Sequence, residues 1–254
     1  MVLKCCSCGS GVTSPPPSLQ AEDYRAGKGD YRNTFVEQRE DFDRYAADFL
    51  RFIERMTGGL QGQRFLEIGC GTGNLLSAAQ DAGAAVVGIE VDEQTKPISE
   101  ARGFRVFDVD VVSWSVEETG QYDIVALSHV LEHIPALDDW LAALNRLLRP
   151  GGWLFFCQPK CPNLVAALLK HRWYGWRPEQ HYWHFSPEGV RALIARHGFT
   201  VAGVDTNSLD HSPPRVADIT RPKFFVAVLS AFLLARVGSS IGMGDQFYLA
   251  ARKS

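Results

Sequence analysis

Apolar residues in the middle of the chain fall into short runs that alternate with helical patterns. Each run of four to eight residues is bounded by turn signals, which is typical of a buried strand. Strands alternating with helices indicate βαβ units and a parallel sheet covered by helices on both faces. The predicted strands are RFLEIGC (64–70), AAVVGIEV (84–91), FRVFDVD (104–110), YDIVALSHVL (122–131) and WLFFCQP (153–159). The predicted helices between them are NLLSAAQDAG (74–83), EQTKPISEARG (93–103) and LDDWLAALNRLLRPGG (137–152).

The two ends of the chain have different patterns. Residues 35–56 place apolar side chains at helical spacing, which predicts a leading amphipathic helix. Residues 1–33 are rich in Cys, Gly, Ser and Pro without sustained periodicity, so we expect an extended arm. The chain is therefore divided into an arm, 1–33, and one domain, 34–254, in which 208–244 is an apolar insertion.

Composition limits the classes of partner. A net charge of −3 and a pI near 6.2 supply no basic field, so nucleic acid is not expected and small molecules or glycans fit better. Six unevenly spaced cysteines do not form a disulfide framework in a chain of this length, so reduced thiols are expected. With no signal-peptide pattern and no apolar run of about 20 residues, the expected location is the cytoplasm.

Three glycines at alternate positions, Gly69, Gly71 and Gly73, follow the first predicted strand. Ligands bind outside the carboxyl ends of parallel strands, and such glycines permit a tight turn and close backbone approach at a helix N-terminus. A dinucleotide fingerprint would have its third glycine where this chain has Asn74, and Glu67 would set a negative charge beside a pyrophosphate. The pattern therefore favours a cationic ligand.

A second acid, Glu90, ends the next strand about 20 residues beyond the glycine turn, where a carboxylate can accept hydrogen bonds from ribose hydroxyls. A nucleoside that carries a positive charge satisfies both acids. S-adenosylmethionine is such a molecule.

With these features the chain resembles the class I S-adenosylmethionine-dependent methyltransferases over roughly residues 61–159. The motifs are EIGCGTG, GIEVD, FDVD, YDIVALSHVLEHI and LLRPGGWLFFCQP, in this order. The segment 179–206 resembles the tail of the family 23 methyltransferases, near the ubiquinone O-methyltransferases and the methyltransferases of glycan clusters. The resemblance implies a Rossmann-like seven-stranded, mostly parallel sheet with a final antiparallel strand, in which GFTVAGVDTN (198–207) and DQFYLAARK (245–253) form the closing pair.

The resemblance also assigns cofactor-binding roles. Glu67 and Gly69 would meet the methionine end, Glu90 the ribose and Asp108 the adenine amino group, with Asp110 as a rival to Asp108. Gly71 and Gly73 would shape the turn, and the pocket would be lined by Leu127, Ser128 and His129.

Transfer to oxygen also needs a group that takes the acceptor's proton, and histidine is the usual choice. His181 is the preferred candidate, with His129, His133 and His184 as others. The alternative for His181 is packing among neighbouring aromatic rings. The acceptor is expected to be a small molecule, a glycan or a lipid-linked compound.

The sequence offers two candidate metal sites, and neither is expected to hold an ion. His129, Glu132 and His133 could turn toward one cation, or Glu132 and His133 could support the following helix. The segment CCSCGSG (5–11) resembles the second half of the zinc ribbon that precedes some sugar methyltransferases, which suggests a remnant without a closed site.

Several alternatives stay open at this point. A nicotinamide-dependent oxidoreductase would share the sheet, and a non-catalytic S-adenosylmethionine-binding protein would keep the glycine turn. The insertion 208–244 predicts a lid or wall beside the acceptor, a helix of the core or a dimer interface. Peripheral membrane contact and the oligomeric state are not decided by the sequence.

Overall fold

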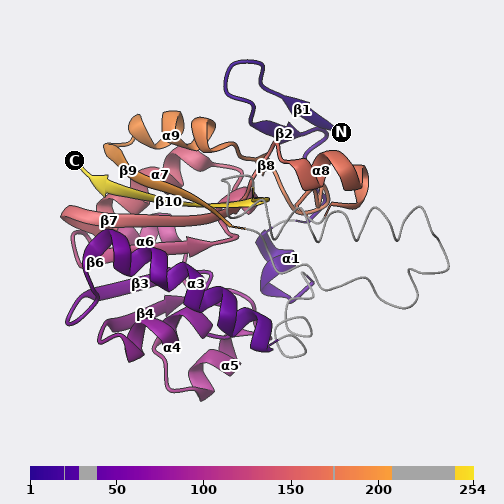
Figure 1. The fold of residues 1–254 in the computed structure, drawn as a ribbon. Helices are drawn as coiled ribbons and strands as arrows, with labels where there is room; N and C mark the ends of the chain where they lie inside the picture. The colour runs from indigo at the N-terminus through magenta and orange to yellow at the C-terminus, as the bar shows by residue number, and fades with distance from the viewer. Residues whose placement is uncertain (20, 29–38, 174, 208–243) are drawn as a thin grey trace.

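The computed structural model describes residues 1–19, 21–28, 39–173, 175–207 and 244–254, and its centre is a seven-stranded sheet (Figure 1). The strand order is β5-β4-β3-β6-β7-β10-β9. Strand β10 runs antiparallel to both of its neighbours, whereas β3 to β7 are parallel. The predicted fold class is therefore confirmed. The strands are β3 (Arg64–Ile68), β4 (Ala85–Ile89), β5 (Val106–Phe107), β6 (Tyr122–Ser128), β7 (Leu148–Pro159), β9 (Phe199–Asn207) and β10 (Gln246–Lys253).

Helices cover both faces of this sheet and enclose two apolar cores. One core lies against α3 (Arg39–Thr57) and α4 (Asn74–Asp81). The other lies against α6 (Val111–Glu117), α7 (Leu137–Leu147) and α9 (Pro187–Ala195). The remaining helical elements are α1 (Ala21–Arg25), α5 (Lys96–Ala101), α8 (Leu164–Leu169), η1 (Leu131–His133) and η2 (Lys170–Arg172). The predicted leading helix corresponds to α3, while residues 35–38 lie outside the described residues.

The topology creates one natural ligand position. From β3 the chain moves outward through β4 and β5, then returns to pair β6 with the other edge of β3 and continues to β7. Strand order therefore reverses between β3 and β6. A crevice forms outside the carboxyl ends of strands at such a point, and the candidate residues Glu67, Glu90 and His129 all lie at this edge.

The N-terminal segment is not an extended arm. Strands β1 (Val2–Lys4) and β2 (Gly11–Thr13) form an antiparallel hairpin, and β2 also pairs with β8 (Trp183–His184). Figure 1 shows this small sheet, together with α1, beside the carboxyl end of the parallel strands. Strands of two or three residues are too short to produce a readable period, and β8 lies far along the chain, so the sequence pattern could not indicate the pairing.

The cap of α9 and the apolar insertion were also predicted from the sequence. Ser186 caps α9 as predicted, because its Oγ accepts a hydrogen bond from Gly189 N at 2.9 Å. The apolar insertion 208–244 lies outside the described residues except for its last residue. None of the helices that the structure describes has the length and apolar content needed to cross a bilayer.

Candidate functional site

The turn between β3 and α4 is shaped by glycines in the left-handed region. Gly69, Gly71 and Gly73 have φ of 74°, 51° and 78°. A Cβ on Gly69 would lie 2.4 Å from Val130 Cγ2, so a side chain there would collide with the loop that follows β6. Gly73 occupies the N-cap of α4 without a side-chain capping bond. The first turn of α4 therefore presents backbone N–H groups to the crevice.

Glu67 is a buried carboxylate on β3. Its exposed fraction is 4%, and Oε2 has no hydrogen-bond partner among the described residues. Burial, followed by the charge of Glu90, raises the pKa of Glu67 well above its ordinary value. Burying such a group without a partner is costly. The orphaned oxygen therefore fits a cationic ligand group, which is what the resemblance assigns to it.

Glu90, directly after β4, is tied to the glycine turn. Its Oε2 accepts a hydrogen bond from Gly71 N at 2.7 Å, and its Oε1 accepts from Val91 N at 2.8 Å and Asp92 N at 2.9 Å. Burial raises the pKa of Glu90, although the bonds from Asp92 and Gly71 oppose this effect. Oε1 already accepts two hydrogen bonds, whereas Oε2 accepts one and keeps a second lone-pair direction, so the side chain is held in place and can still accept from a ligand hydroxyl.

Asp108 and Asp110 have different surroundings. Asp110 is the N-cap of α6, where its Oδ2 accepts from Ser113 N at 2.9 Å and Ser113 Oγ at 2.6 Å. Asp108 is exposed and pairs with Arg25 at the end of α1. Capping accounts for Asp110, so Asp108 is the better candidate for an adenine contact, and Arg25 lies over it.

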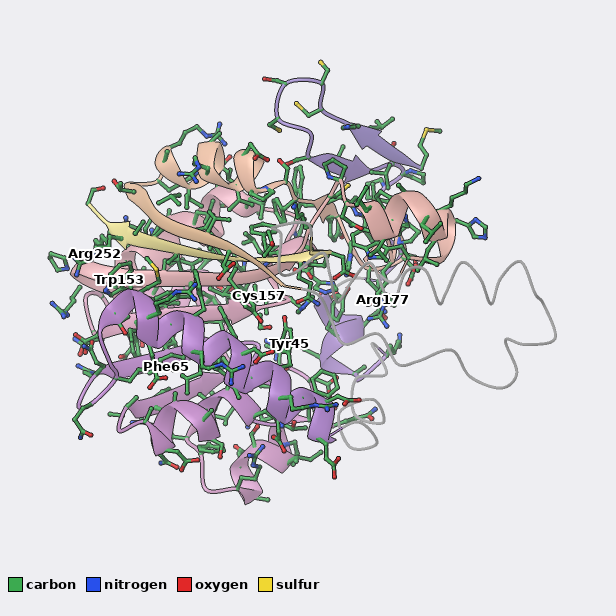
Figure 2. The ribbon with its side chains drawn as sticks, in the orientation of Figure 1. Tyr45, Phe65, Trp153, Cys157, Arg177 and Arg252 are labelled. Carbon is green, nitrogen blue, oxygen red and sulfur yellow. The ribbon has the colours of Figure 1, made fainter. Side chains whose placement is uncertain are left out.

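Leu127, Ser128 and His129 end β6 beside the turn. Leu127 is fully buried, and Ser128 Oγ lies 3.5 Å from Tyr45 Oη. The Tyr45 hydroxyl donates to Gln246 Oε1 at 3.0 Å, so it accepts from His129 Nε2 at 2.8 Å. Tyr45 Oη also contacts Cys157 Sγ, and Figure 2 shows Tyr45 and Cys157 approaching each other from α3 and β7.

His129 is a cation in this arrangement. Its Nε2–H donates to Tyr45, and its Nδ1 lies 3.3 Å from Glu132 Oε1, an ion-pair distance. Burial alone would lower the pKa of His129, but the interactions with Cys157 and Glu132 outweigh it and raise the pKa to about 10. An imidazolium has no free lone pair, so the geometry disfavours the prediction of His129 as a base.

The other three histidines of this region are neutral; His181 and His184 are buried, and His133 is partly buried. Burial lowers the pKa of both His133 and His181 to about 3, and that of His184 to about 4. His133 and His181 pack edge to face with centroids 4.7 Å apart. Glu132, His133 and His181 bring one ligand atom each to within 4.8 Å of one another. His181 thus stands beside Glu132 and His133 where the metal alternative, which the sequence did not favour, had His129. Its contact with His133 spans 48 residues, and no spacing signal indicates it.

The cysteines carry no disulfide. All six are free thiols, and Cys70, Cys157 and Cys161 are buried. Cys5 lies on the hairpin turn, where bonds from the Cys8 and Ser7 backbone lower its pKa. The zinc-ribbon remnant at Cys5 and Cys8 stays a prediction.

A family model described as a methyltransferase domain matches residues 35–204, more than half of the chain. The chain belongs to this methyltransferase family. A nicotinamide-dependent oxidoreductase would leave Glu67 unexplained, and its fingerprint would have a third glycine where this chain has Asn74.

Curated relatives of this methyltransferase include two ubiquinone biosynthesis O-methyltransferases. The Bordetella avium protein is 39% identical over 113 residues, which cover 42% of this chain and 47% of the relative. The Acinetobacter baylyi protein is 34% identical over 116 residues, which cover 42% of this chain and 48% of the relative. The chain thus spans about half the length of these relatives.

A solved structure supports the same fold. The magnesium protoporphyrin IX methyltransferase of Synechocystis PCC 6803, solved with bound SAH, has a TM-score of 0.62 at 18% identity. The alignment covers 91% of this chain and 97% of that one. At this identity the likeness concerns the fold.

Proposed function

We propose that this methyltransferase uses S-adenosylmethionine and transfers the methyl group to a hydroxyl oxygen of a small-molecule acceptor. The observation that carries the cofactor is the buried carboxylate oxygen of Glu67, which has no partner among the described residues and lies on the strand that leads into the glycine turn. A positively charged ligand compensates this group, whereas a pyrophosphate would be repelled by it.

Different residues of the crevice bind different parts of the cofactor. Glu67 and the Gly69 backbone meet the methionine end, and Glu90 accepts hydrogen bonds from the ribose hydroxyls. Asp108 meets the adenine amino group once Arg25 has moved away from it. The sulfonium supplies an already activated methyl group, so the chain's task is to align the acceptor and exclude water.

The acceptor side is formed by η1 and the segment before β8. The relatives named as ubiquinone biosynthesis O-methyltransferases favour oxygen as the nucleophile. The acceptor's proton leaves on the side of Glu132, His133 and His181, where two neutral imidazoles lie beside a buried carboxylate. His129, as a fixed cation, donates a hydrogen bond to Tyr45 and accepts no proton.

The test compares binding and turnover. Calorimetry should detect binding of S-adenosylmethionine and none of NAD. Glu90→Ala should weaken cofactor binding by roughly 1–3 kcal/mol, because the ribose hydroxyls lose a buried partner. Glu117→Ala, which removes an exposed acid on α6, is the matched control and should bind as the wild type does.

Turnover is measured with methyl-labelled cofactor and a panel of hydroxylated aromatic, glycan and amine acceptors. Label in a hydroxylated compound supports the proposal. Tight cofactor binding without transfer to any acceptor would favour the non-catalytic alternative, and unchanged affinity of Glu90→Ala would remove Glu90 from the ribose site.

A further inference from the structure

Three side chains from two segments of the chain converge beneath the proposed acceptor side. Glu132 and His133 belong to η1, and His181 precedes β8. One ligand atom from each lies within 4.8 Å of the other two. Glu132 is 1% exposed and His181 is 4% exposed. These are a carboxylate oxygen and two ring nitrogens gathered in the interior.

The hydrogen bonds of the two histidines determine which nitrogen is free. His181 Nδ1 lies 3.0 Å from Gly175 O, and a carbonyl can only accept, so Nδ1 carries the proton. His133 Nδ1 lies 3.2 Å from Gln180 O and 2.9 Å from Tyr24 Oη, which itself donates to Gln180 O. His133 Nδ1 is therefore also protonated. Both Nε2 atoms keep their lone pairs.

This pattern is the one that metal-binding histidines adopt. A ligating histidine almost always donates its second ring N–H to a carbonyl, a carboxylate or water, which fixes its tautomer and orientation. Here two backbone carbonyls, Gly175 O and Gln180 O, perform that role. An ordinary packing role requires neither the shared tautomer nor the convergence on a carboxylate.

Glu132 provides the second observation. Neither Oε1 nor Oε2 has a hydrogen-bond partner among the described residues, although Oε1 lies 3.3 Å from His129 Nδ1. A buried carboxylate needs charge compensation together with hydrogen bonds or metal coordination. His129 balances the charge from one side, and both oxygens keep coordination capacity.

We propose that Glu132 and the Nε2 atoms of His133 and His181 bind a divalent transition-metal ion. Two imidazoles with one carboxylate suit Zn²⁺, Co²⁺ or Mn²⁺, whereas Mg²⁺ and Ca²⁺ prefer oxygen ligands. Three protein ligands leave a coordination position for a further oxygen. His181 is then a ligand, in place of the base that the sequence predicted.

The site would deepen the proposed function, on which its role in transfer rests. A hydroxyl oxygen bound to the ion has a lowered pKa, so its proton passes to water and the oxygen becomes the nucleophile without a strong base. In the transfer itself the new C–O bond forms as the S–C bond breaks, and sulfur keeps the electron pair.

Metal binding is measured directly on chelator-treated, dialysed protein. Co²⁺ is titrated and followed by its visible d–d absorption, and Zn²⁺ and Mg²⁺ are titrated by calorimetry. The exposed thiols of the hairpin could also bind these ions, so each titration is repeated in a variant with Cys5, Cys6 and Cys8 replaced by serine. We expect one equivalent of Co²⁺ or Zn²⁺ in both backgrounds and at least tenfold weaker Mg²⁺ binding.

Glu132→Gln and His181→Ala should each weaken Co²⁺ binding at least tenfold. His171→Ala removes an exposed histidine on η2 and should bind Co²⁺ as the wild type does. Circular dichroism and S-adenosylmethionine affinity show that each variant is folded. The proposal is overturned if the serine variant binds no stoichiometric Co²⁺ or Zn²⁺, or if both ligand variants bind like the wild type. Failure of cofactor binding with intact metal binding would instead contradict the proposed function.

Discussion

At the scale of single residues, the buried carboxyl group of Glu67 should affect both the stability of the protein and its binding of the cofactor. Its carboxylate is buried, and its pKa in the folded protein lies well above the ordinary value of 4.5. The folded protein therefore holds this proton more tightly than the unfolded chain does. The associated stability is fully present below pH 4.5 and is lost as the pH rises through the folded-state pKa.

Glu67→Gln should consequently stabilise the ligand-free protein at pH 8, because an uncharged amide replaces the buried carboxylate. The gain should disappear below pH 4.5, where the wild-type carboxyl group is protonated in both states. The same variant should show a smaller rise in Tm with S-adenosylmethionine, because it lacks the negative charge. Thermal unfolding across pH checks both effects, and parallel curves for the two proteins would contradict the prediction.

The role of a residue could be predicted where it depends on local sequence. Prediction failed where the role depends on contacts with distant parts of the chain. Ser186 before Pro187 signals a helix cap, and the structure has it. The choice between Asp108 and Asp110 needed the bond to Ser113, which sequence spacing alone left open. The charge of His129 depends on Tyr45 and Cys157, which approach it from other elements.

At the scale of elements, the turn from β3 to α4 depends on the left-handed backbone of Gly71, whose φ is 51° and whose N–H bonds to Glu90. Gly71→Val should abolish S-adenosylmethionine binding, because a β-branched residue is strained there and displaces the turn. Gly120→Val is the matched control, since φ is 69° and no atom lies within 4 Å of a Cβ. Calorimetry should show binding in the control alone. Equal affinity in both variants would show that the turn is not part of the cofactor site.

Helix α1 connects the two sides of the crevice. Tyr24 Oη contacts His133 Nδ1, and Arg25 pairs with Asp108. If the adenine amino group needs Asp108, then Arg25 competes with the cofactor. An exposed ion pair is worth about 0–1 kcal/mol, so Arg25→Ala should tighten S-adenosylmethionine binding by up to about fivefold. Weaker binding in calorimetry would show that Arg25 contributes to the cofactor site, and Arg51→Ala on α3 serves as the control.

The elements of the sheet were predictable because apolar runs and helical periods repeat through 64–159. The small sheet of β1, β2 and β8 was not, because three short strands have no period and pair across most of the chain. The cluster of Glu132, His133 and His181 was missed for the same reason. It requires the segment before β8 to fold back onto η1.

At the scale of the whole molecule, Thr13 joins the N-terminal hairpin to the segment that holds His181 and His184. Its hydroxyl donates to His181 O at 2.7 Å and accepts from His184 Nε2 at 2.9 Å. Thr13→Val should destabilise the protein by about 1–3 kcal/mol, because a buried carbonyl and ring nitrogen lose their partner. Thr200→Val, at an exposed position on β9, should have little effect. Urea unfolding measures the stability of both variants. Equal midpoints for Thr13→Val and the wild type would contradict the linking role of Thr13.

The pairing of β2 with β8 also constrains the order of events during synthesis. Val12 leaves the ribosome long before its partner Trp183, which follows 183 − 12 = 171 residues later. At about 5–20 residues per second, the hairpin waits roughly 10 to 30 s for the strand that completes its sheet. The glycine turn and both of its acids are translated within the first half of the chain. A nascent chain of this protein therefore gains the glycine turn and its two acids first, and the sheet of β1, β2 and β8 closes only after Trp183 has emerged.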